Sequence, residues 1–537
     1  MEQFDYIIVG AGSAGSVLAD QLSASGRHRV LVLESGPKDR SPWIHVPAGY
    51  GKLFYHPQLN YGYHSEPQPT LQGRQDYWPR GHVVGGSGAI NAMVYCRGMA
   101  NDFNDWERAG ATGWNWAAAR KTYGEIETQV APDGQTQGAG PIHVSDVRRK
   151  IHPASRYFFD ALNTQQLPQT EDMNGDAPEG GGVYRLNTRK GRRCAAAQAF
   201  LKPALKRKNL ELRTDAKVQR VLFDGKRATG VQVMSRGVLH EIKAGEVILS
   251  AGAVHSPLIL QRSGLGSSTL LQRHGVDVIV ANDNIGGNLQ DHLGINYYFQ
   301  ATEPTLNQVL GTWLGKARAA LQYALTRSGP LSLSVNQCGG FFRSTPDQIA
   351  PDQQLYFNPV TYTTTQQGTR NVIHPDPFPG FILGMQPTRP TSRGRIEMTG
   401  TRHEDAPRIV PNSLETDADQ QMVINGGRLC AKILNAPALQ GLIKAPMYVD
   451  VRGMKDGDIL EDFRARCGTV FHPVSTCRMG DSAATAVIDP KMRVFGVEGL
   501  RVVDASAFPN ITSGNTNAPT MMLAHRAAKL IKETSTK

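Results

Sequence analysis

Three glycines and one carboxylate near the start of the chain have the spacing of a dinucleotide-binding site. Gly10, Gly12 and Gly15 form a GxGxxG pattern directly after an apolar run at residues 4–9. The first glycine permits a tight turn, the second lets the backbone approach a pyrophosphate, and the third lets a helix pack closely on the strand. Glu34 ends a second apolar run, where it can accept hydrogen bonds from adenosine ribose hydroxyls. The pattern predicts dinucleotide binding; the alternative is a glycine-rich structural turn.

A strand, a helix and a second strand must position these groups, and the apolar runs predict them in that order. The buried run at residues 246–252 ends in small residues, which let a chain pass close to a cofactor, so we expect it to rejoin the first sheet. Pro519 favours the first turn of a final helix that extends to about residue 531. Further elements are predicted as a helix at 194–206 and strands at 210–213, 218–223, 230–234 and 500–504.

The character of the chain changes between residues 296 and 453. Trp313, Ala317, Leu321 and Ala324 have helical spacing, and alternating strand patterns such as residues 395–398 follow. This region is expected to form a second domain, a sheet with helices on one face.

Composition excludes several classes of protein. The chain has 537 residues, 40% hydrophobic and 20% charged, which is ordinary for a globular protein of more than one domain. Its net charge of +11 comes from scattered Lys and Arg, including the pair Arg192 and Arg193, so a basic solvated surface is favoured over nucleic-acid binding. No apolar stretch approaches the ~20 residues of a membrane span, and the first strand begins too early for a signal peptide. Six cysteines lack metal-ligand spacing, so free buried thiols and no metal are expected.

A second GxGxxG with strand and acid context is missing from the sequence. Flavoenzymes that take hydride from NADPH usually carry two dinucleotide folds. The chain is therefore either a nicotinamide enzyme or a flavoenzyme whose reductant is the substrate itself.

Six ordered motifs, including the first, resemble those of the glucose–methanol–choline (GMC) oxidoreductases, which bind FAD and oxidise alcohols. The other five are residues 85–91 (GGSGAIN), 252–266 (GAVHSPLILQRSGLG), 287–292 (GNLQDH), 471–480 (FHPVSTCRMG), and 503–504 (VD) together with 514–519 (GNTNAP). The resemblance spans nearly the whole chain. It implies an α/β fold in which a Rossmann-like FAD-binding domain is interleaved with an α+β substrate-binding domain, an antiparallel sheet flanked by helices.

The expected domain boundaries follow from the resemblance and the pattern. Residues 1–150 form the first part of the FAD-binding domain with flavin-covering loops, and 151–295 are mixed and return to that domain. Residues 296–453 are mainly the substrate-binding domain, and 454–537 carry the last part of the FAD-binding domain with the catalytic residues.

The resemblance also implies the catalytic groups. His472 takes the role of general base, because removing a hydroxyl proton suits the pKa range of histidine; the alternative is a structural histidine. Asn515 matches the second active-site position and can orient a substrate oxygen, unless it is a loop or cap asparagine. Phe471 is a candidate wall of the substrate pocket, with core packing as the alternative. His292 and His255 are interpreted as structural.

FAD is the expected cofactor, held noncovalently, because Ile90 stands where some members have a histidine that attaches the flavin. His82 replaces the Arg or Lys common before the glycine loop, and Gly88 stands where Ser is usual; both are expected to alter local FAD contacts without abolishing binding. Asp504 is expected near the ribityl or pyrophosphate region, although a strand-terminal Asp is also a common turn residue. The full set implied to contact FAD is Gly10, Gly12, Ser13, Ala14, Gly15, Glu34, Ser35, Val84, Gly86, Asn91, Ala92, Val94, Val218, Ala251, Asp504, Ala505, Asn515, Thr516 and Asn517.

The expected function is oxidation of primary alcohols to aldehydes by hydride transfer to flavin N5, with alkyl or aryl alcohols ahead of choline and sugars. The alternatives are a hydroxynitrile lyase or another non-redox member of the fold, a sugar or choline oxidoreductase, and a flavin-binding protein without activity. Oxygen, a quinone or another acceptor would reoxidise the flavin, so the sequence leaves oxidase and dehydrogenase both open. The location is expected to be cytoplasmic, with peripheral membrane contact left open, and the oligomeric state is not predicted.

Overall fold

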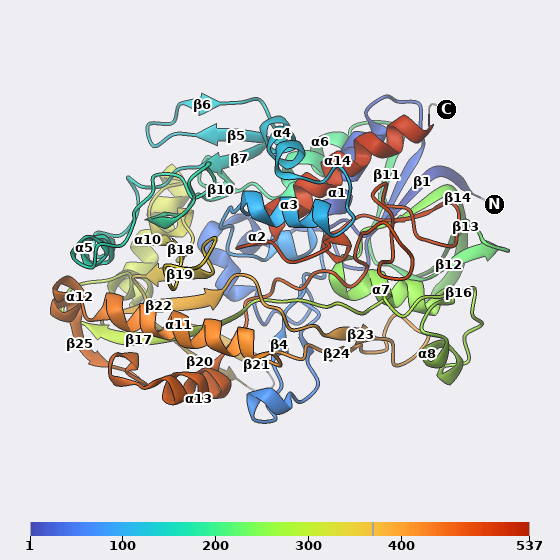
Figure 1. Cartoon of the computed structure of the whole chain (residues 1–537). Helices are drawn as coiled ribbons and strands as arrows, with labels where there is room; N and C mark the ends of the chain where they lie inside the picture. Colours follow the sequence, from blue (N-terminus) through green and yellow to red (C-terminus); the bar gives the residue numbers. More distant parts are fainter. Residues whose placement is uncertain (1, 368–369, 536–537) are drawn as a thin grey trace.

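Seven strands from distant parts of the chain form the first sheet of the computed structural model, which describes residues 2–367 and 370–535. The sheet order is β11-β2-β1-β14-β13-β12, with β27 beside β14. The labelled strands β11, β1, β14, β13 and β12 lie together at the right of Figure 1. The strands are β1 (Gln3–Val9), β2 (Val30–Leu33), β11 (Leu210–Arg213), β12 (Ala216–Asp224), β13 (Arg227–Ser235), β14 (Val238–Leu249) and β27 (Leu500–Val502).

Parallel pairing at the centre of this sheet brings strand ends together at one edge. β1 pairs in parallel with both β2 and β14, and β27 pairs in parallel with β14. The predicted return of the chain to the first sheet is therefore confirmed. The strand ends at Leu249, earlier than expected, because α7 (Gly252–Arg262) begins directly after the turn. The carboxyl ends of parallel strands are where open α/β sheets bind ligands.

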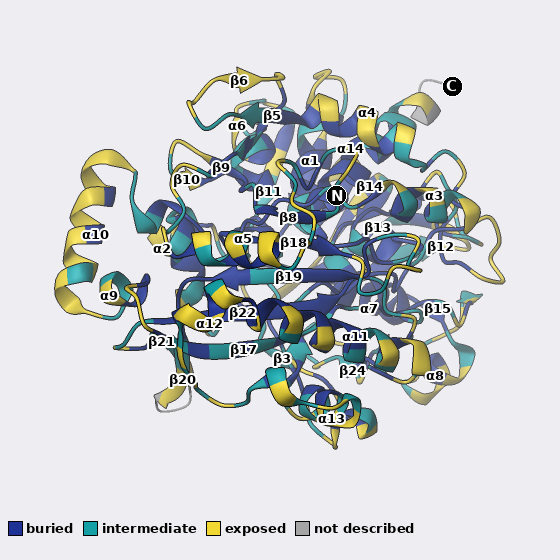
Figure 2. Cartoon of the chain, turned by 60° about the vertical axis from the view of Figure 1, so that its left-hand side comes forward, coloured by how far each residue is buried: buried dark blue, intermediate teal, exposed yellow. Residues whose placement is uncertain are grey.

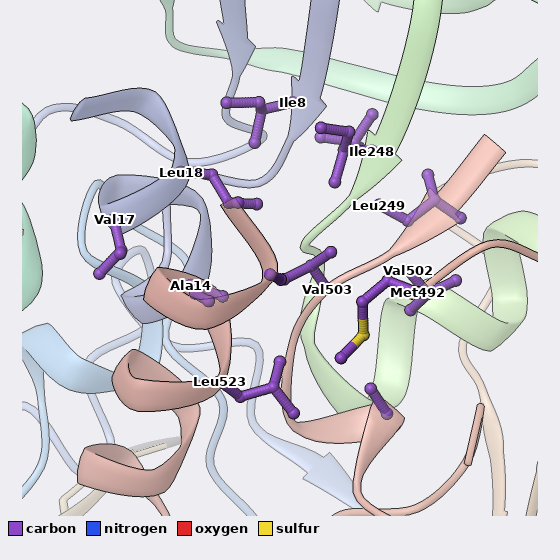
Figure 3. Packing of buried hydrophobic residues seen from close by; sticks show 14 of the residues in the cluster. Ile8, Ala14, Val17, Leu18, Ile248, Leu249, Met492, Val502, Val503 and Leu523 are labelled. Carbon is purple, nitrogen blue, oxygen red and sulfur yellow. The ribbon is translucent and has the colours of Figure 1, made fainter. Parts of the chain in front are cut away.

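Two helices cover one face of the sheet and complete the first core. α1 (Ser13–Ser23) follows β1, and α14 (Asn517–Ser535) packs against it although it comes from the other end of the chain. Figure 3 shows Leu18 of α1 and Leu523 of α14 among the strand residues Ile8 and Ile248, all of them fully buried or nearly so. This packing places the first turns of both helices at the same edge of the sheet.

The second sheet is antiparallel, with the order β18-β19-β22-β17-β25 and β26 beside β17. Stacked rings run through its core, where Phe357 lies 5.5 Å from Phe158 and 5.3 Å from Phe381 between ring centroids. The strands are β17 (Leu293–Ala301), β18 (Cys338–Phe342), β19 (Gln353–Asn358), β22 (Gly380–Pro387), β25 (Ile443–Pro446) and β26 (Gly468–Thr469). The helices α5 (Ser155–Thr164) and α11 (Asp417–Leu434) pack on this sheet. The expected fold class is confirmed.

Three predicted elements differ in detail from the observed ones. The helix expected at 194–206 is a π-helical turn (Ala197–Leu201) followed by the short α6 (Lys202–Ala204); Pro203 has no N–H with which to continue a regular helix. The strand β23 (Arg395–Glu397) pairs with β24 (Arg408–Val410) in a separate two-stranded sheet. The final helix extends from Asn517 to Ser535, beyond the expected end near residue 531, and Pro519 lies in its first turn as predicted.

Two further expectations concern membranes and thiols. Within residues 2–367 and 370–535, no helix has the length and apolar character needed to cross a bilayer. All six cysteines are buried and free, which confirms the expectation for the thiols.

Candidate active site

A cavity of about 970 Å³ runs from the glycine turn after β1 to His472 and Asn515. Its wall combines the edge of the first sheet, the loops at residues 43–94 and strands of the second sheet. His472, Asn515, Phe471 and seventeen of the nineteen predicted FAD contacts line it, Asn515 being one of those contacts. The seventeen are Gly10, Gly12, Ser13, Ala14, Glu34, Ser35, Gly86, Asn91, Ala92, Val94, Val218, Ala251, Asp504, Ala505, Asn515, Thr516 and Asn517.

Gly15 and Val84 do not line this cavity. A Cβ atom on Gly15 would lie 1.9 Å from the carbonyl oxygen of Gly10, so this glycine allows α1 to lie against the turn after β1. Val84 is 3% exposed and belongs to the first core. Both residues therefore support the wall of the cavity from behind.

The glycine turn leaves backbone amides exposed to the cavity. Gly10 has φ +103° and a Cβ there would meet Ser250 O at 2.4 Å, so the turn needs a glycine on both counts. Gly12 caps α1, and no side chain caps the first turn of the helix. These N–H groups and the positive end of the helix dipole suit a pyrophosphate.

Glu34 lies at the end of β2, opposite the turn. Its two carboxylate oxygens accept hydrogen bonds from Ala11 N and Gly36 N, both at 2.9 Å. Burial raises the pKa of Glu34 to about 6 despite these donors. A carboxylate has about four acceptor positions, so further positions remain for the hydroxyls of a ribose.

The glycine loop meets α1 and α14 at a tight contact. Ser13 Oγ donates to Asn517 Oδ1 at 2.7 Å. A Cβ on Gly88 would lie 2.6 Å from Ser13 Oγ and 3.3 Å from Asn517 Oδ1. Gly88 differs from the residue common at this position in the family, and the structure gives the reason: the absence of a side chain leaves room for this hydrogen bond.

Asp504 joins the end of β27 to the start of α7. It accepts hydrogen bonds from Gly252 N, Ser256 Oγ and both the N–H and the hydroxyl of Ser506, at 2.5–2.8 Å. Burial raises its pKa. Asp504 thus forms the turn expected of a strand-terminal aspartate and also lines the cavity.

A contact between two neutral histidines determines which nitrogen of His472 carries a proton. His292 Nε2 lies 2.8 Å from Thr388 O, which can only accept, so this nitrogen is protonated. The unprotonated Nδ1 of His292 lies 3.0 Å from Nδ1 of His472, so His472 donates there. Nε2 of His472 consequently keeps its lone pair, and Asn515 Nδ2 donates to it at 3.1 Å. His472 presents a base to the cavity.

The side chain of Asn515 is oriented by a thiol. Cys96 Sγ donates to Asn515 Oδ1 at 3.3 Å, which turns the amide NH2 toward His472. Burial raises the pKa of Cys96 to about 12, so it stays a protonated donor. His472 Nε2 and Asn515 Nδ2 together offer one acceptor and one donor to a hydroxyl group.

The partly buried carboxylate of Asp291 holds the backbone of His472. Asp291 accepts from His472 N at 2.7 Å and from the hydroxyl of Thr469, and burial raises its pKa to about 7. Phe471 has φ +71°, a strained conformation for an aromatic residue. Arg80 donates to Phe471 O at 2.6 Å and holds this conformation in place.

Electrostatics keep His472 neutral. Burial, with smaller contributions from His292 and Arg80, lowers its pKa well below the ordinary value of 6.5. Burial lowers the pKa of His292 to about 4. Both rings are therefore neutral at neutral pH, as the hydrogen bonds above require.

Aromatic and aliphatic side chains surround the space in front of His472. Phe471 lines the cavity and its ring lies 5.3 Å from that of Phe54 between centroids. Among the described residues that line the cavity, the acidic ones are Glu34 and Asp504, both at the end near the glycine turn. The remaining wall near His472 includes Tyr298, Val335, Tyr356, Val360, Tyr362, Met385 and Val470.

The chain as folded fits FAD. Exposed amides at a helix N-terminus, a carboxylate beside them and a close glycine pair, in which a Cβ on Gly86 would lie 2.9 Å from Gly12 Cα, lie along one wall. The cavity continues from these groups to the His472–Asn515 pair.

Comparison with known proteins agrees with this geometry. The GMC oxidoreductase family profiles match residues 4–294 and 390–524. The chain belongs to the GMC oxidoreductase family. A Pseudomonas putida protein named alcohol dehydrogenase (acceptor) is 38% identical over 98% of this chain and 95% of its own length. Human mitochondrial choline dehydrogenase is 39% identical over 99% of this chain and 90% of its own.

Solved structures give the same result for the fold. A pyridoxine 4-oxidase from Mesorbium loti superposes with a TM-score of 0.86 at 29% identity, over 98% of this chain and 99% of that chain. This GMC oxidoreductase is thus an FAD-dependent oxidoreductase, which resolves the choice left by the single GxGxxG in favour of a flavoenzyme.

The sequence pattern alone does not reveal the residues that orient His472 and Asn515. His292 was interpreted as structural, yet its ring contacts that of His472. The position of His292 in the GNLQDH motif could have indicated a role at the site, whereas nothing in the sequence pointed to Arg80 or Cys96. The interpretation of Arg192 and Arg193 as a solvated face is right for Arg192 and wrong for Arg193. Arg193 is 2% exposed and donates to Ile44, Gly88 and Asn91.

Proposed function

We propose that this GMC oxidoreductase oxidises neutral primary alcohols, alkyl or aryl, to aldehydes, with His472 as the general base. The observation that carries the proposal is the lone pair on His472 Nε2, which faces the cavity beside the Asn515 amide. The relatives named for alcohol and choline dehydrogenase activity support the same class of reaction.

The catalytic pair would bind the hydroxyl group of the substrate at two points. The hydroxyl oxygen accepts from Asn515 Nδ2, and the hydroxyl proton points to His472 Nε2, which removes it. The contact between these two side chains, 3.1 Å without substrate, would open to admit the oxygen. When bound, FAD supplies the two-electron acceptor for the hydride that leaves the carbinol carbon.

The residues around the pair favour a neutral substrate over choline. A quaternary ammonium is commonly recognised by an aromatic cage or a carboxylate. The acids that line the described part of the cavity lie at its other end, whereas the cations Lys52, Arg80, Lys316 and Arg466 line it. Tyrosine rings are present. Arg466 is paired with Asp462, but the other three cations oppose the approach of a positive charge.

FAD would be bound noncovalently, because Ile90 occupies the position at which some members of the family attach the flavin. Ile90 lines the cavity and is 8% exposed, and its side chain offers no nucleophile.

The test is an anaerobic absorbance titration of the FAD-loaded protein with hexanol, benzyl alcohol and choline. We expect bleaching of the flavin bands by hexanol or benzyl alcohol, and a rate of bleaching lower by about 10²–10⁴-fold in His472→Ala. His240→Ala is the matched control, because His240 is exposed on β14 and does not line the cavity. Admitting air afterwards shows whether oxygen reoxidises the reduced flavin or another acceptor is required.

Bleaching by choline alone would overturn the substrate class. Equal rates in His472→Ala and His240→Ala would overturn the role of the base. A protein that binds FAD and is bleached by none of the alcohols would contradict the proposed reaction.

A further inference from the structure

The helix α10 (Trp313–Thr326) carries a large apolar face that the rest of the chain leaves exposed. Among the residues the structure describes, ten large hydrophobic side chains are exposed, and four of them lie on this helix: Trp313 (76%), Leu314 (58%), Leu321 (62%) and Leu325 (75%). In α10 only Ala319 and Tyr323 are buried. Figure 2 shows the helix standing at the edge of the molecule, exposed over most of its surface.

Cations surround this face. Lys316 and Arg318 lie on the helix, and Arg327 caps its carboxyl end. The sequence contains no Asp or Glu from residue 304 to residue 346. The helix and its cap therefore carry three cations and no acid.

A basic turn lies under the carboxyl end of the helix. Tyr323 Oη donates to Gly191 O at 2.9 Å, which fixes α10 on the turn between β9 (Thr188–Arg189) and β10 (Arg192–Arg193). Arg189, Lys190 and Arg192 on this turn are exposed. These cations add positive charge at the carboxyl end of the helix, beside the anchored Tyr323.

We propose that α10 and this basic turn dock the protein on the surface of an anionic lipid membrane. Trp and Leu on one face of a helix with Lys and Arg beside them suit the interface between headgroups and acyl chains. Each cation near such a surface also gains from the negative potential of the lipid. The protein would lie on the membrane and not span it.

A second copy of the chain fits this surface less well. Symmetric pairing through α10 would bring the three cations of each helix near those of the other, with no acid on either helix to offset them. Like charges opposed across an interface are unfavourable. An anionic lipid surface complements both features of the face at once.

The position of α10 relates the docking surface to the cavity. Lys316 and Ala320, on the flank between the buried and the apolar face, line the cavity that leads to His472. Docking would thus place the rim of the cavity at the membrane surface, where apolar alcohols concentrate. The docking surface itself does not depend on the proposed reaction.

The experiment is co-sedimentation of the full-length, FAD-loaded protein with phosphatidylcholine vesicles, with and without phosphatidylglycerol. We expect binding to the anionic vesicles to be at least about tenfold tighter than to the neutral ones. L321E/L325E should lose at least about tenfold of the binding, and R189Q/R318Q should lose the preference for anionic lipid. The matched control is V238E/L239E, which adds the same charge at exposed apolar residues of β14.

Two readouts keep the result interpretable. Neither Leu321 nor Leu325 lines the cavity, so the FAD content and alcohol oxidation of the variant should equal those of the wild type. The fluorescence that Trp313 contributes, taken as the difference from Trp313→Phe, should shift to shorter wavelength on anionic vesicles. Absence of vesicle binding, or equal loss in both double glutamate variants, would overturn the proposal. So would a wild-type dimer in gel filtration that L321E/L325E converts to a monomer.

Discussion

At the scale of single residues, the role proposed for His472 as the base depends on its contact with His292. Replacing His292 by Leu removes the acceptor for His472 Nδ1–H, so the ring can turn or change tautomer and Nε2 is no longer held as the base. We expect the rate of flavin bleaching by alcohol to fall by about 10²-fold, the cost of a misplaced catalytic group. His292→Gln, whose amide can accept and donate, should recover part of the rate. Unchanged kinetics in His292→Leu would contradict the positioning role.

The pH dependence of the reaction follows from the lowered pKa of His472. A histidine whose pKa lies below 6.5 is neutral, and thus a base, at every pH above that value. The bleaching rate should therefore be flat above pH about 6.5 and fall on the acid side with a midpoint below it. Stopped-flow mixing of protein and alcohol without oxygen, at several pH values, measures this profile.

Asp291 is a second group whose titration could lower the bleaching rate at acid pH, and it must be distinguished from His472. Its pKa is raised to about 7, so it also titrates near neutrality while it holds the backbone of His472. The acid limb should persist in Asp291→Asn if it belongs to His472. A profile that becomes flat in this variant would assign the limb to Asp291 instead.

At the scale of elements, the contact of α1, the glycine loop and α14 is expected to control cofactor affinity. In Gly88→Ala the new Cβ would displace Ser13 from Asn517, since 2.6 Å from an oxygen is too close for any carbon. Loss of a hydrogen bond and a shift of the loop should cost about 1–2 kcal/mol, or roughly tenfold in the dissociation constant of FAD. Titration of the apoprotein with FAD measures it.

A control variant and a compensating double variant test this prediction. Gly124→Ala is the control, because Gly124 is exposed in α4 (Trp116–Ile126) and a Cβ there meets nothing within 4 Å. Ser13→Gly combined with Gly88→Ala removes the atom that clashes and should restore part of the affinity. Equal FAD affinity in Gly88→Ala and wild type would contradict the account of the loop.

Elements and their pairing could be predicted where the sequence pattern is local. The GxGxxG turn places Gly10 and Gly12 on the cavity wall, and the small residues after β14 indicated its return to the first sheet. The tight pair of Ser13 and Asn517 joins residues 504 positions apart, and no local pattern reports such a contact. The same holds for Cys96 and Asn515, and for Arg80, whose role depends on a strained backbone that only the folded chain creates at Phe471.

At the scale of the whole molecule, one cavity joins the two sheets, so FAD should stabilise both together. Its wall combines the turn after β1 with residues of β17, β19 and β22, such as Tyr298, Tyr356 and Met385. A ligand that binds only the folded state at 100 times its dissociation constant adds about 2.7 kcal/mol to the free energy of unfolding. For a chain of 537 residues this raises the melting temperature by about 2 °C.

Thermal melts of the apoprotein at increasing FAD concentration test this coupling. We expect a single transition that moves to higher temperature with FAD, because a cofactor that contacts both sheets cannot stabilise one of them alone. Denaturation of the loaded protein should release all of the FAD into solution, since Ile90 offers no nucleophile for attachment. Two transitions of which only one responds to FAD would contradict the joint stabilisation. Flavin that stays with the precipitated chain would contradict noncovalent binding.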